Sequence, residues 1–134
     1  MKILIVDDSR SMRQIVRLSL SEIPGCEIIE AVDGVEAETN LQEAELLGKP
    51  FDIVILDWMM PNFNGYQLLK SIRTTDSFKD RPIVIMLTAE TYPEQIEACL
   101  KYNVASYILK PFTKEILLAA VNKAVAERDQ KHAV

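Results

Sequence analysis

Short apolar runs alternate with longer amphipathic segments five times along the chain. The apolar runs lie at Ile3–Val6, Glu27–Ala31, Asp52–Leu56, Ile83–Leu87 and Ser106–Leu109. Their length and their β-branched residues predict strands, and runs without polar alternation are typical of strands that helices cover on both faces. The pattern therefore predicts repeated βα units and a parallel sheet.

The segments that follow these runs predict five helices. They lie at Ser11–Ile23, Val35–Leu47, Gly65–Ile72, Pro93–Tyr102 and Thr113–Glu127. Ser11 and Gln14 fit a capping box at the start of the first helix. Five strands and five helices account for the whole chain, so we expect one domain over residues 1–134 and no effector domain.

Composition narrows the class of protein. Of the 134 residues, 49% are hydrophobic and 26% are charged, which is typical of a globular domain. No apolar run reaches the roughly 18 residues of a membrane span, and no signal peptide precedes the first strand. The net charge of −5 argues against a nucleic-acid partner. We therefore expect a cytoplasmic protein that binds neither nucleic acid nor membrane.

Histidine and cysteine chemistry is disfavoured. His132 is the only histidine and lies in a polar C-terminal segment. Cys26 and Cys99 are far apart and fit no C-x-x-C spacing, so we expect reduced thiols. A histidine-based catalytic pair, a zinc site and a phosphohistidine carrier all become improbable.

Polar residues gather where the predicted strands end. In chain order they are Asp7, Asp8, Asp57, Thr88 and Lys110, the last followed by Pro111. An aspartate, threonine or lysine taken alone has an ordinary explanation as a cap, a turn or a solvated side chain. In an open parallel sheet, however, ligands bind outside the carboxyl ends of the strands. We therefore expect these side chains to share one edge.

Three clustered carboxylates need a cation or a proton. Two unit charges 4 Å apart repel by about 4 kcal/mol at an effective dielectric constant near 20, and one lysine offsets only part of this. Carboxylates without histidine or cysteine partners suit Mg²⁺, or Mn²⁺ in its place, rather than zinc. Asp57 ends the central strand, and aspartate nucleophiles that form acyl phosphates are an established mode of catalysis. The pattern predicts a pocket for a magnesium ion and a phosphoryl group.

Four motifs carry a family resemblance: DD at 7–8, DWMMPNFNGYQLLKSIR at 57–73, TAE at 88–90 and KPF at 110–112. Together they resemble the receiver domains of two-component response regulators, and most closely the single-domain chemotaxis regulators. The resemblance implies a flavodoxin-like (βα)5 fold, a doubly wound sheet with strand order 2-1-3-4-5.

The resemblance also implies roles at the site. Asp57 is expected to be the phosphoacceptor, supplied by a histidine kinase. Asp8 and Asp57 are expected to bind Mg²⁺ with the backbone carbonyl of Met59, while Asp7 orients a metal-bound water. Lys110 is expected to contact the phosphoryl group, and Lys110–Pro111 is a candidate cis peptide.

A switch is implied as well. Thr88 is expected to move its hydroxyl onto the phosphoryl oxygens, and Tyr107 to rotate inward. This couples the site to the surface of the fourth helix, fifth strand and fifth helix. The resemblance suggests a flagellar motor switch protein as the partner of a monomeric regulator that is not an enzyme beyond its own phosphorylation and dephosphorylation.

Two residues at the rim bear on the chemistry. Met59 stands two places after the phosphoacceptor, where many chemotaxis regulators have a polar residue, and its side chain cannot orient an attacking water. Glu90, on the opposite rim, matches the chemotaxis pattern and is expected to affect access. Gly65 is expected to provide a backbone shape that side chains resist.

Other functions stay open at this point. A receiver of this kind can also be a phosphorelay intermediate, the regulator of a non-flagellar partner, or a module that binds without being phosphorylated. An aspartate-nucleophile phosphohydrolase is remote, because Met59 occupies the place of the second aspartate that such enzymes use. A nucleotide-binding module is disfavoured, because neither of its glycine-rich motifs occurs.

Overall fold

The structure, a computed structural model, describes residues 1–60, 64–79, 81–89 and 92–132. Its elements are, in chain order, β1 (Lys2–Val6), α1 (Arg10–Leu20), β2 (Glu27–Ala31), α2 (Gly34–Leu46), β3 (Ile53–Leu56), α3 (Gly65–Thr74), the short 3-10 helix η1 (Asp76–Phe78), β4 (Ile83–Thr88), α4 (Pro93–Lys101), β5 (Val104–Leu109) and α5 (Lys114–His132). The predicted alternation of strands and helices is confirmed. No helix among the described residues is long and apolar enough to cross a membrane.

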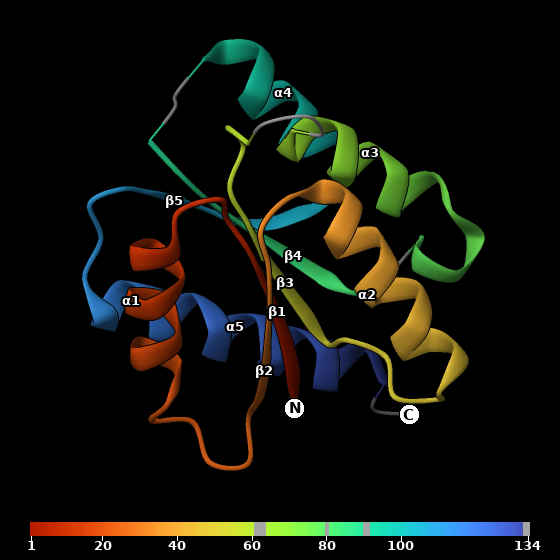
Figure 1. Ribbon diagram of the computed structural model, residues 1–134, viewed down its shortest axis with the longest axis horizontal. Coiled ribbons are helices and arrows are strands. Elements are labelled where there is room, and N and C mark those ends of the chain that lie inside the picture. Colours follow the sequence, from red (N-terminus) through yellow and green to blue (C-terminus); the bar gives the residue numbers. More distant parts are fainter. Residues whose placement is uncertain (61–63, 80, 90–91, 133–134) are drawn as a thin grey trace.

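The five strands form one parallel sheet in the order β2-β1-β3-β4-β5 (Figure 1). This is the flavodoxin-like order that the resemblance implied. The chain runs from β1 outward to β2 and then returns past β1 to β3, so the loops after β1 and β3 diverge to opposite sides of the sheet. A crevice is expected at such a switch point, at the carboxyl ends of the strands.

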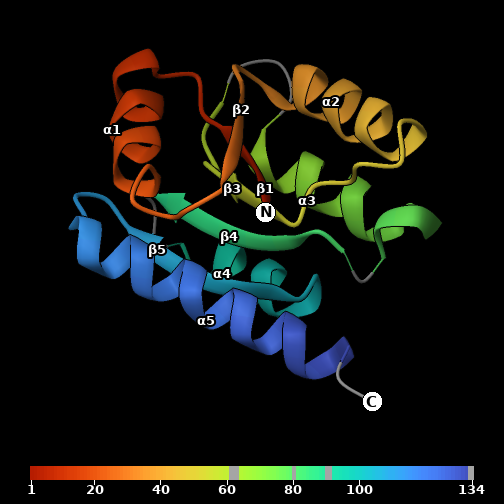
Figure 2. The ribbon, with the colours of Figure 1, turned by 90° about the horizontal axis from the view of Figure 1, so that it is seen from below.

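Helices cover both faces of the sheet (Figure 2). One face packs on α1 and α5, and the other on α2, α3 and α4. Because successive strand residues point to opposite faces, Ile3 and Ile5 lie in the first layer and Leu4 and Val6 in the second. All four are at most 1% exposed, which explains why this strand shows no polar alternation.

Two helices are followed by residues in the left-handed backbone conformation. Gly48 and Asn103 have positive φ angles of 71° and 57° and follow the last residues of α2 and α4. The prediction for α1 was wrong, however. Ser9 caps this helix by accepting a hydrogen bond from the N–H of Met12, so the helix begins at Arg10 and not at Ser11. The Ser11–Gln14 spacing fits a capping box, but Ser11 lies inside the first turn of the helix that Ser9 caps.

The fifth strand is longer than its apolar run. It begins at Val104, directly after Asn103, rather than at Ser106. Val84 pairs with Val104 and the next residue, Ile85, pairs with Ser106, so Ala105 is an extra residue that bulges from the ladder. A bulge interrupts the side-chain alternation from which strands are predicted, which explains the short prediction.

Both cysteines are free, as expected. Cys99 lies buried in α4 against the sheet, and Cys26 is half-buried just before β2.

Candidate functional site

Three carboxylates meet at the carboxyl edge of the sheet. Asp7 and Asp8 follow β1, and Asp57 follows the neighbouring strand β3, where its N–H donates to the carbonyl of Val6 at 3.0 Å. One oxygen of each carboxylate lies within 4.8 Å of the others. Asp7 and Asp57 are buried, at 4% and 8% exposure, whereas Asp8 is exposed. The predicted cluster is present, with two of its members largely shielded from water.

Lys110 bridges the two buried acids. Its Nζ lies 2.9 Å from Oδ2 of Asp7 and 3.3 Å from Oδ2 of Asp57, so residues 103 and 53 positions away in sequence converge on one ammonium. Burial opposes the charged form, but the hydrogen bond to Asp7 and the attraction of Asp57 outweigh it and raise the pKa of Lys110. The lysine is therefore a fixed positive charge at neutral pH.

The lysine is held in place by its backbone. Its N–H donates to the carbonyl of Thr88 at 3.0 Å, which joins the ends of β4 and β5. The following peptide bond, Lys110–Pro111, is cis, as the resemblance implied. A second cis peptide, Arg81–Pro82, was not predicted, because an Arg-Pro dipeptide carries no signal for it.

Asp57 has an altered acidity. Burial raises the pKa of its carboxyl group, and the charge of Asp7 adds to the rise, while Lys110 and a hydrogen bond with the Thr88 side chain oppose it. Thr88 is fully buried. The raised pKa means that the environment disfavours the charged form of Asp57. A cation or a covalently bound group at this carboxylate would reduce that unfavourable energy.

The donor set fits a hard divalent cation. Among the described residues, the only cluster of three potential metal-binding side chains consists of these aspartates, and all three offer oxygen. Two carboxylates 4.8 Å apart repel by about 3.5 kcal/mol at an effective dielectric constant of 20. Lys110 supplies one positive charge against three negative ones, so an acidic pocket with a net negative charge remains.

Residues 3–122 match the response regulator receiver domain family. The chain belongs to this family. It is 37% identical over 129 residues to chemotaxis protein CheY1 of Helicobacter pylori, covering 96% of this chain and 100% of that protein. It is 40% identical over 117 residues to a CheY homologue of Campylobacter jejuni, covering 87% and 86% of the two chains.

Solved structures of receiver domains have the same fold. CheY4 of Vibrio cholerae superposes with a TM-score of 0.79 at 35% identity, covering 92% of this chain and 97% of that one. The BeF3-activated DrrB receiver domain gives a TM-score of 0.74 at 29% identity, covering 93% and 97%. The resemblance inferred from the motifs is therefore confirmed, and this receiver domain is a homologue of the CheY chemotaxis response regulators.

The structure describes two of the three other predicted residues of this receiver domain. Met59 is 57% exposed, and its N–H donates to Oδ1 of Asp57 at 3.4 Å, which places its backbone beside the acids. Tyr107 is half-buried on β5, against the layer that contains α4. Glu90 lies outside the residues that the structure describes.

The structure adds two residues that the sequence did not single out. The N–H of Ser9 donates to Oδ1 of Asp7 at 2.9 Å, and the guanidinium of Arg13 donates to the carbonyl of Asp7 at 2.8 Å. Asp7 is therefore held by the N-cap residue of α1 and by a residue of its first turn. The signal for Ser9 was its place two residues after an aspartate, a common turn spacing. Arg13 had no comparable signal.

The predicted requirement for glycine at position 65 holds for a different reason. Gly65 has no positive φ. Instead, a Cβ added there would lie 2.3 Å from the carbonyl oxygen of Asp57 and 2.6 Å from Cα of Trp58. Its N–H donates to the Trp58 carbonyl at 2.8 Å. The start of α3 is therefore pressed directly against the backbone of Asp57.

Proposed function

We propose that this receiver domain accepts a phosphoryl group on Asp57 from a histidine kinase and that the modification changes a protein-binding surface. The observation that carries the proposal is the bridge of Lys110 between Asp7 and Asp57, at the edge where Thr88 and Asp8 also lie. The membership of the receiver family and the likeness to CheY proteins of chemotaxis support it.

The reaction transfers a phosphoryl group between two nucleophiles. A carboxylate oxygen of Asp57 attacks phosphorus, a new O–P bond forms, and the N–P bond to the kinase histidine breaks with its electron pair returning to the imidazole nitrogen. Such a transition state spreads charge over three equatorial oxygens, so catalysis consists mainly of positioning and charge stabilisation. Asp57 suits the role because it ends the central strand.

Mg²⁺, or Mn²⁺ in its place, is the cofactor we assign to the acidic pocket. Asp8, Asp57 and the backbone carbonyl of Met59 would hold it, and Asp7 would hold a bound water. The ion supplies positive charge to the phosphoryl oxygens during transfer. Ser9 holds the Asp7 carboxylate by its N–H, and Arg13 holds the Asp7 backbone carbonyl.

Lys110 and Thr88 act on the phosphoryl group once it is bound. The ammonium that now contacts Asp57 would contact a phosphoryl oxygen in its place, and the Thr88 hydroxyl would donate to another. Charge-assisted hydrogen bonds of this kind are short and are about twice as strong as neutral ones. The movement of Thr88 is expected to let Tyr107 rotate inward.

The output surface is the face formed by α4, β5 and α5. Ile96 and Leu100 of α4 are 46% and 81% exposed. Lys101 of α4 and Lys114 of α5 are exposed as well, and Nζ of Lys114 lies 2.6 Å from Oε1 of Glu22. Exposed apolar residues mixed with lysine suit a docking surface for an amphipathic segment with acidic residues. We assign it to a chemotaxis target such as a flagellar motor switch protein, bound by the monomer.

Acetyl phosphate tests the acceptor directly. With Mg²⁺, the intact chain is expected to gain the mass of one phosphoryl group, and Asp57→Asn is expected to gain none. Asp76→Asn, a matched change at an exposed aspartate of η1, should react as the unmodified sequence does. Modification of the Asp57→Asn variant, or repeated turnover of unrelated phosphate esters, would contradict the proposal.

A further inference from the structure

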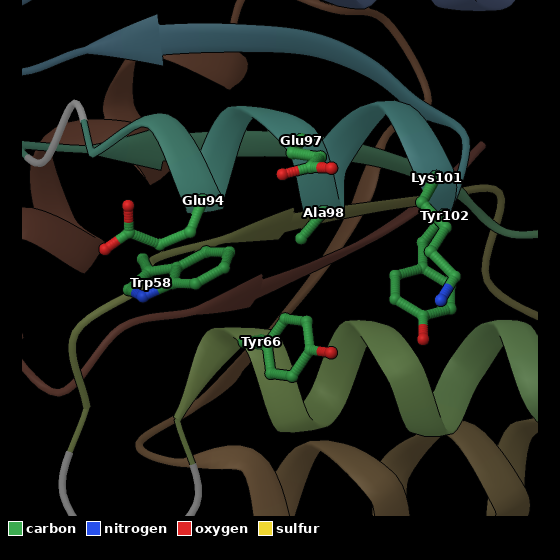
Figure 3. Close-up of a pocket in the computed structure, with 7 residues that line it drawn as sticks. All are labelled: Trp58, Tyr66, Glu94, Glu97, Ala98, Lys101 and Tyr102. Carbon is green, nitrogen blue, oxygen red and sulfur yellow. The ribbon is translucent and has the colours of Figure 1, made fainter.

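An open groove lies between α3 and α4, on the side of the molecule away from α1 and α5. Its volume is about 390 Å³, within the range of binding pockets for small molecules and side chains. Figure 3 shows the residues that line it: Trp58, Tyr66, Glu94, Glu97, Ala98, Lys101 and Tyr102. None of them belongs to the acidic pocket described above.

Three aromatic rings form one wall of the groove. The ring centroids of Trp58 and Tyr66 lie 5.6 Å apart, and those of Tyr66 and Tyr102 lie 6.2 Å apart. The planes are tilted by 41° and 64°, so the rings do not stack face to face on one another. All three are only half-buried. The wall therefore presents aromatic surface to whatever enters.

The facing wall is one side of α4. Glu94, Glu97, Ala98 and Lys101 are spaced i, i+3, i+4 and i+7, so they follow one stripe of the helix over about 10 Å. Glu94 and Glu97 are exposed, and neither forms an ion pair with any residue that the structure describes. Ile96 and Leu100, on the output surface, lie on the other exposed side of α4.

The groove has two electrically different ends. At one end Nζ of Lys101 lies 5.4 Å from the centroid of the Tyr102 ring, a cation–π contact within the chain. At the other end Trp58 and Tyr66 lie opposite Glu94 and Glu97 (Figure 3). There the aromatic faces and the two carboxylates have no cation of their own among the described residues.

We propose that this end of the groove binds an arginine side chain from an extended segment of a partner protein. A guanidinium is planar and weakly hydrated, so it stacks on aromatic rings and donates to carboxylates at the same time. A lysine ammonium is compact and strongly hydrated and does this less well. An anion would be repelled by both glutamates, and the 10 Å stripe leaves room for the backbone of the segment beyond the arginine.

The site adjoins the phosphoacceptor without sharing its chemistry. Trp58 follows Asp57 directly, and Tyr66 follows Gly65, which packs on the Asp57 carbonyl. Binding of arginine nevertheless needs neither a metal ion nor phosphorylation. A failure of the phosphorylation proposal therefore leaves this inference standing, and the reverse is also true.

Titration of the unmodified chain with small probes tests the proposal. At constant ionic strength, N-acetyl-arginine N-methylamide is expected to shift the indole N–H resonance of Trp58 and the backbone resonances of α4 in a saturable way, with a millimolar dissociation constant. The citrulline analogue has the same shape without the charge and should bind about tenfold more weakly. The lysine analogue should also bind more weakly than arginine.

Variants locate the site. The double variant Glu94→Gln, Glu97→Gln is expected to weaken arginine binding about tenfold, which corresponds to two exposed ion pairs. Its matched control is Glu43→Gln, Glu45→Gln, at two exposed positions of α2, which should leave binding unchanged. Tyr66→Leu should weaken binding and keep the spectrum of a folded protein.

Several results would overturn the proposal. Equal binding of the citrulline or lysine analogue would mean that the groove does not recognise a guanidinium. Unchanged affinity in the Glu94→Gln, Glu97→Gln variant would place the arginine elsewhere. Tighter binding of free L-arginine than of the blocked form would indicate a small-molecule site in place of a partner segment.

Discussion

At the scale of single residues, Gly65 leaves no room for a side chain. The atoms that an added Cβ would meet belong to the backbone of Asp57 and Trp58, at 2.3 and 2.6 Å, and a backbone cannot turn aside as a side chain can. Any relief must move the start of α3 or the loop that begins at Asp57. The glycine therefore serves both the stability of the domain and the shape of the site.

Gly65→Ala is expected to lower the free energy of unfolding by about 1–3 kcal/mol, the usual cost of forcing extra atoms into a packed region. Urea unfolding measures this. The matched variant Gly25→Ala has a different problem, because Gly25 has a φ of 69° and open space around it. It should cost about 1 kcal/mol and leave phosphorylation by acetyl phosphate unchanged. Gly65→Ala is expected to slow this phosphorylation, because it moves the backbone of Asp57. If Gly25→Ala slowed it equally, the effect would not be specific to the site.

Met59 is expected to affect the lifetime of the proposed phosphorylated state. Its backbone N–H donates to Asp57, and its exposed side chain has no group that can orient an attacking water. We expect Met59→Asn to lose its phosphoryl group faster than the unmodified sequence, because an amide can position water for hydrolysis. Decay of purified phosphoprotein after removal of acetyl phosphate gives both rates. Equal rates, or slower decay in the variant, would count against a role for this side chain, and Met59→Leu serves as the control that should leave the rate unchanged.

At the scale of elements, Glu30 fastens α1 to β2. It accepts from Nε of Arg13 at 3.0 Å and from Nε of Arg17 at 2.7 Å, one turn apart on α1. The guanidinium of Arg13 also donates to the backbone carbonyl of Asp7. The network therefore links an edge strand, a helix and one acid of the site.

This network predicts a dependence of stability on pH. Partial burial would raise the pKa of Glu30, but the hydrogen bonds and charges of Arg17 and Arg13 outweigh it and lower the pKa below 4.5. A lowered pKa means that the contribution to stability is complete above pH 4.5 and is lost as the pH falls through the value in the folded state.

Glu30→Gln is therefore expected to cost about 0.5–1 kcal/mol at neutral pH and progressively less in acid. Chemical unfolding of both proteins at a series of pH values gives the difference. Glu27→Gln, at an exposed position of the same strand, should show a small difference at every pH. A cost in Glu30→Gln that grows toward low pH would mean that the sign of the pKa shift is wrong.

At the scale of the whole molecule, parallel pairing turns separate strand ends into one site. The registers place Val6 beside Leu56 and Leu56 beside Met86, so the residues just beyond them arrive at the same edge. Helices cover both faces of the sheet, and at this edge Asp7 and Asp57 are buried whereas Asp8 is exposed. This arrangement is opposed by electrostatic repulsion, because oxygens of the three carboxylates lie within 4.8 Å of one another.

A divalent cation should therefore stabilise the folded chain. At a concentration ten times its dissociation constant, Mg²⁺ is expected to add about 1.4 kcal/mol of stability, an increase in Tm of about 5 °C for a domain of this size. Asp8→Asn should reduce the increase in Tm, whereas Asp76→Asn should keep it. Thermal unfolding with and without MgCl2 measures both, and an unchanged shift in Asp8→Asn would remove this residue from the metal site.

Much of the fold and of the site could be predicted from the sequence, because the signals are local. An apolar run bounded by polar residues predicts a buried strand, and a polar residue directly after it lies at a sheet edge whatever the rest of the chain does. Asp7, Asp57, Thr88 and Lys110 were identified in this way. The predictions that failed were also local, since the cap at Ser9 and the bulge at Ala105 depend on one-residue choices that a periodic pattern does not resolve.

The sequence by itself determined the elements, the class of sheet and the residue types at its carboxyl edge, because burial and hydrogen bonding within a strand or a helix depend on neighbours along the chain. Only the tertiary structure decided which side chains touch. Lys110 reaches two acids far away in sequence, Gly65 is required by a carbonyl rather than by its own conformation, and Trp58, Tyr66 and Tyr102 form one wall. These contacts depend on the order of the strands and on the packing of the helices. Neither can be read from a single segment of the sequence.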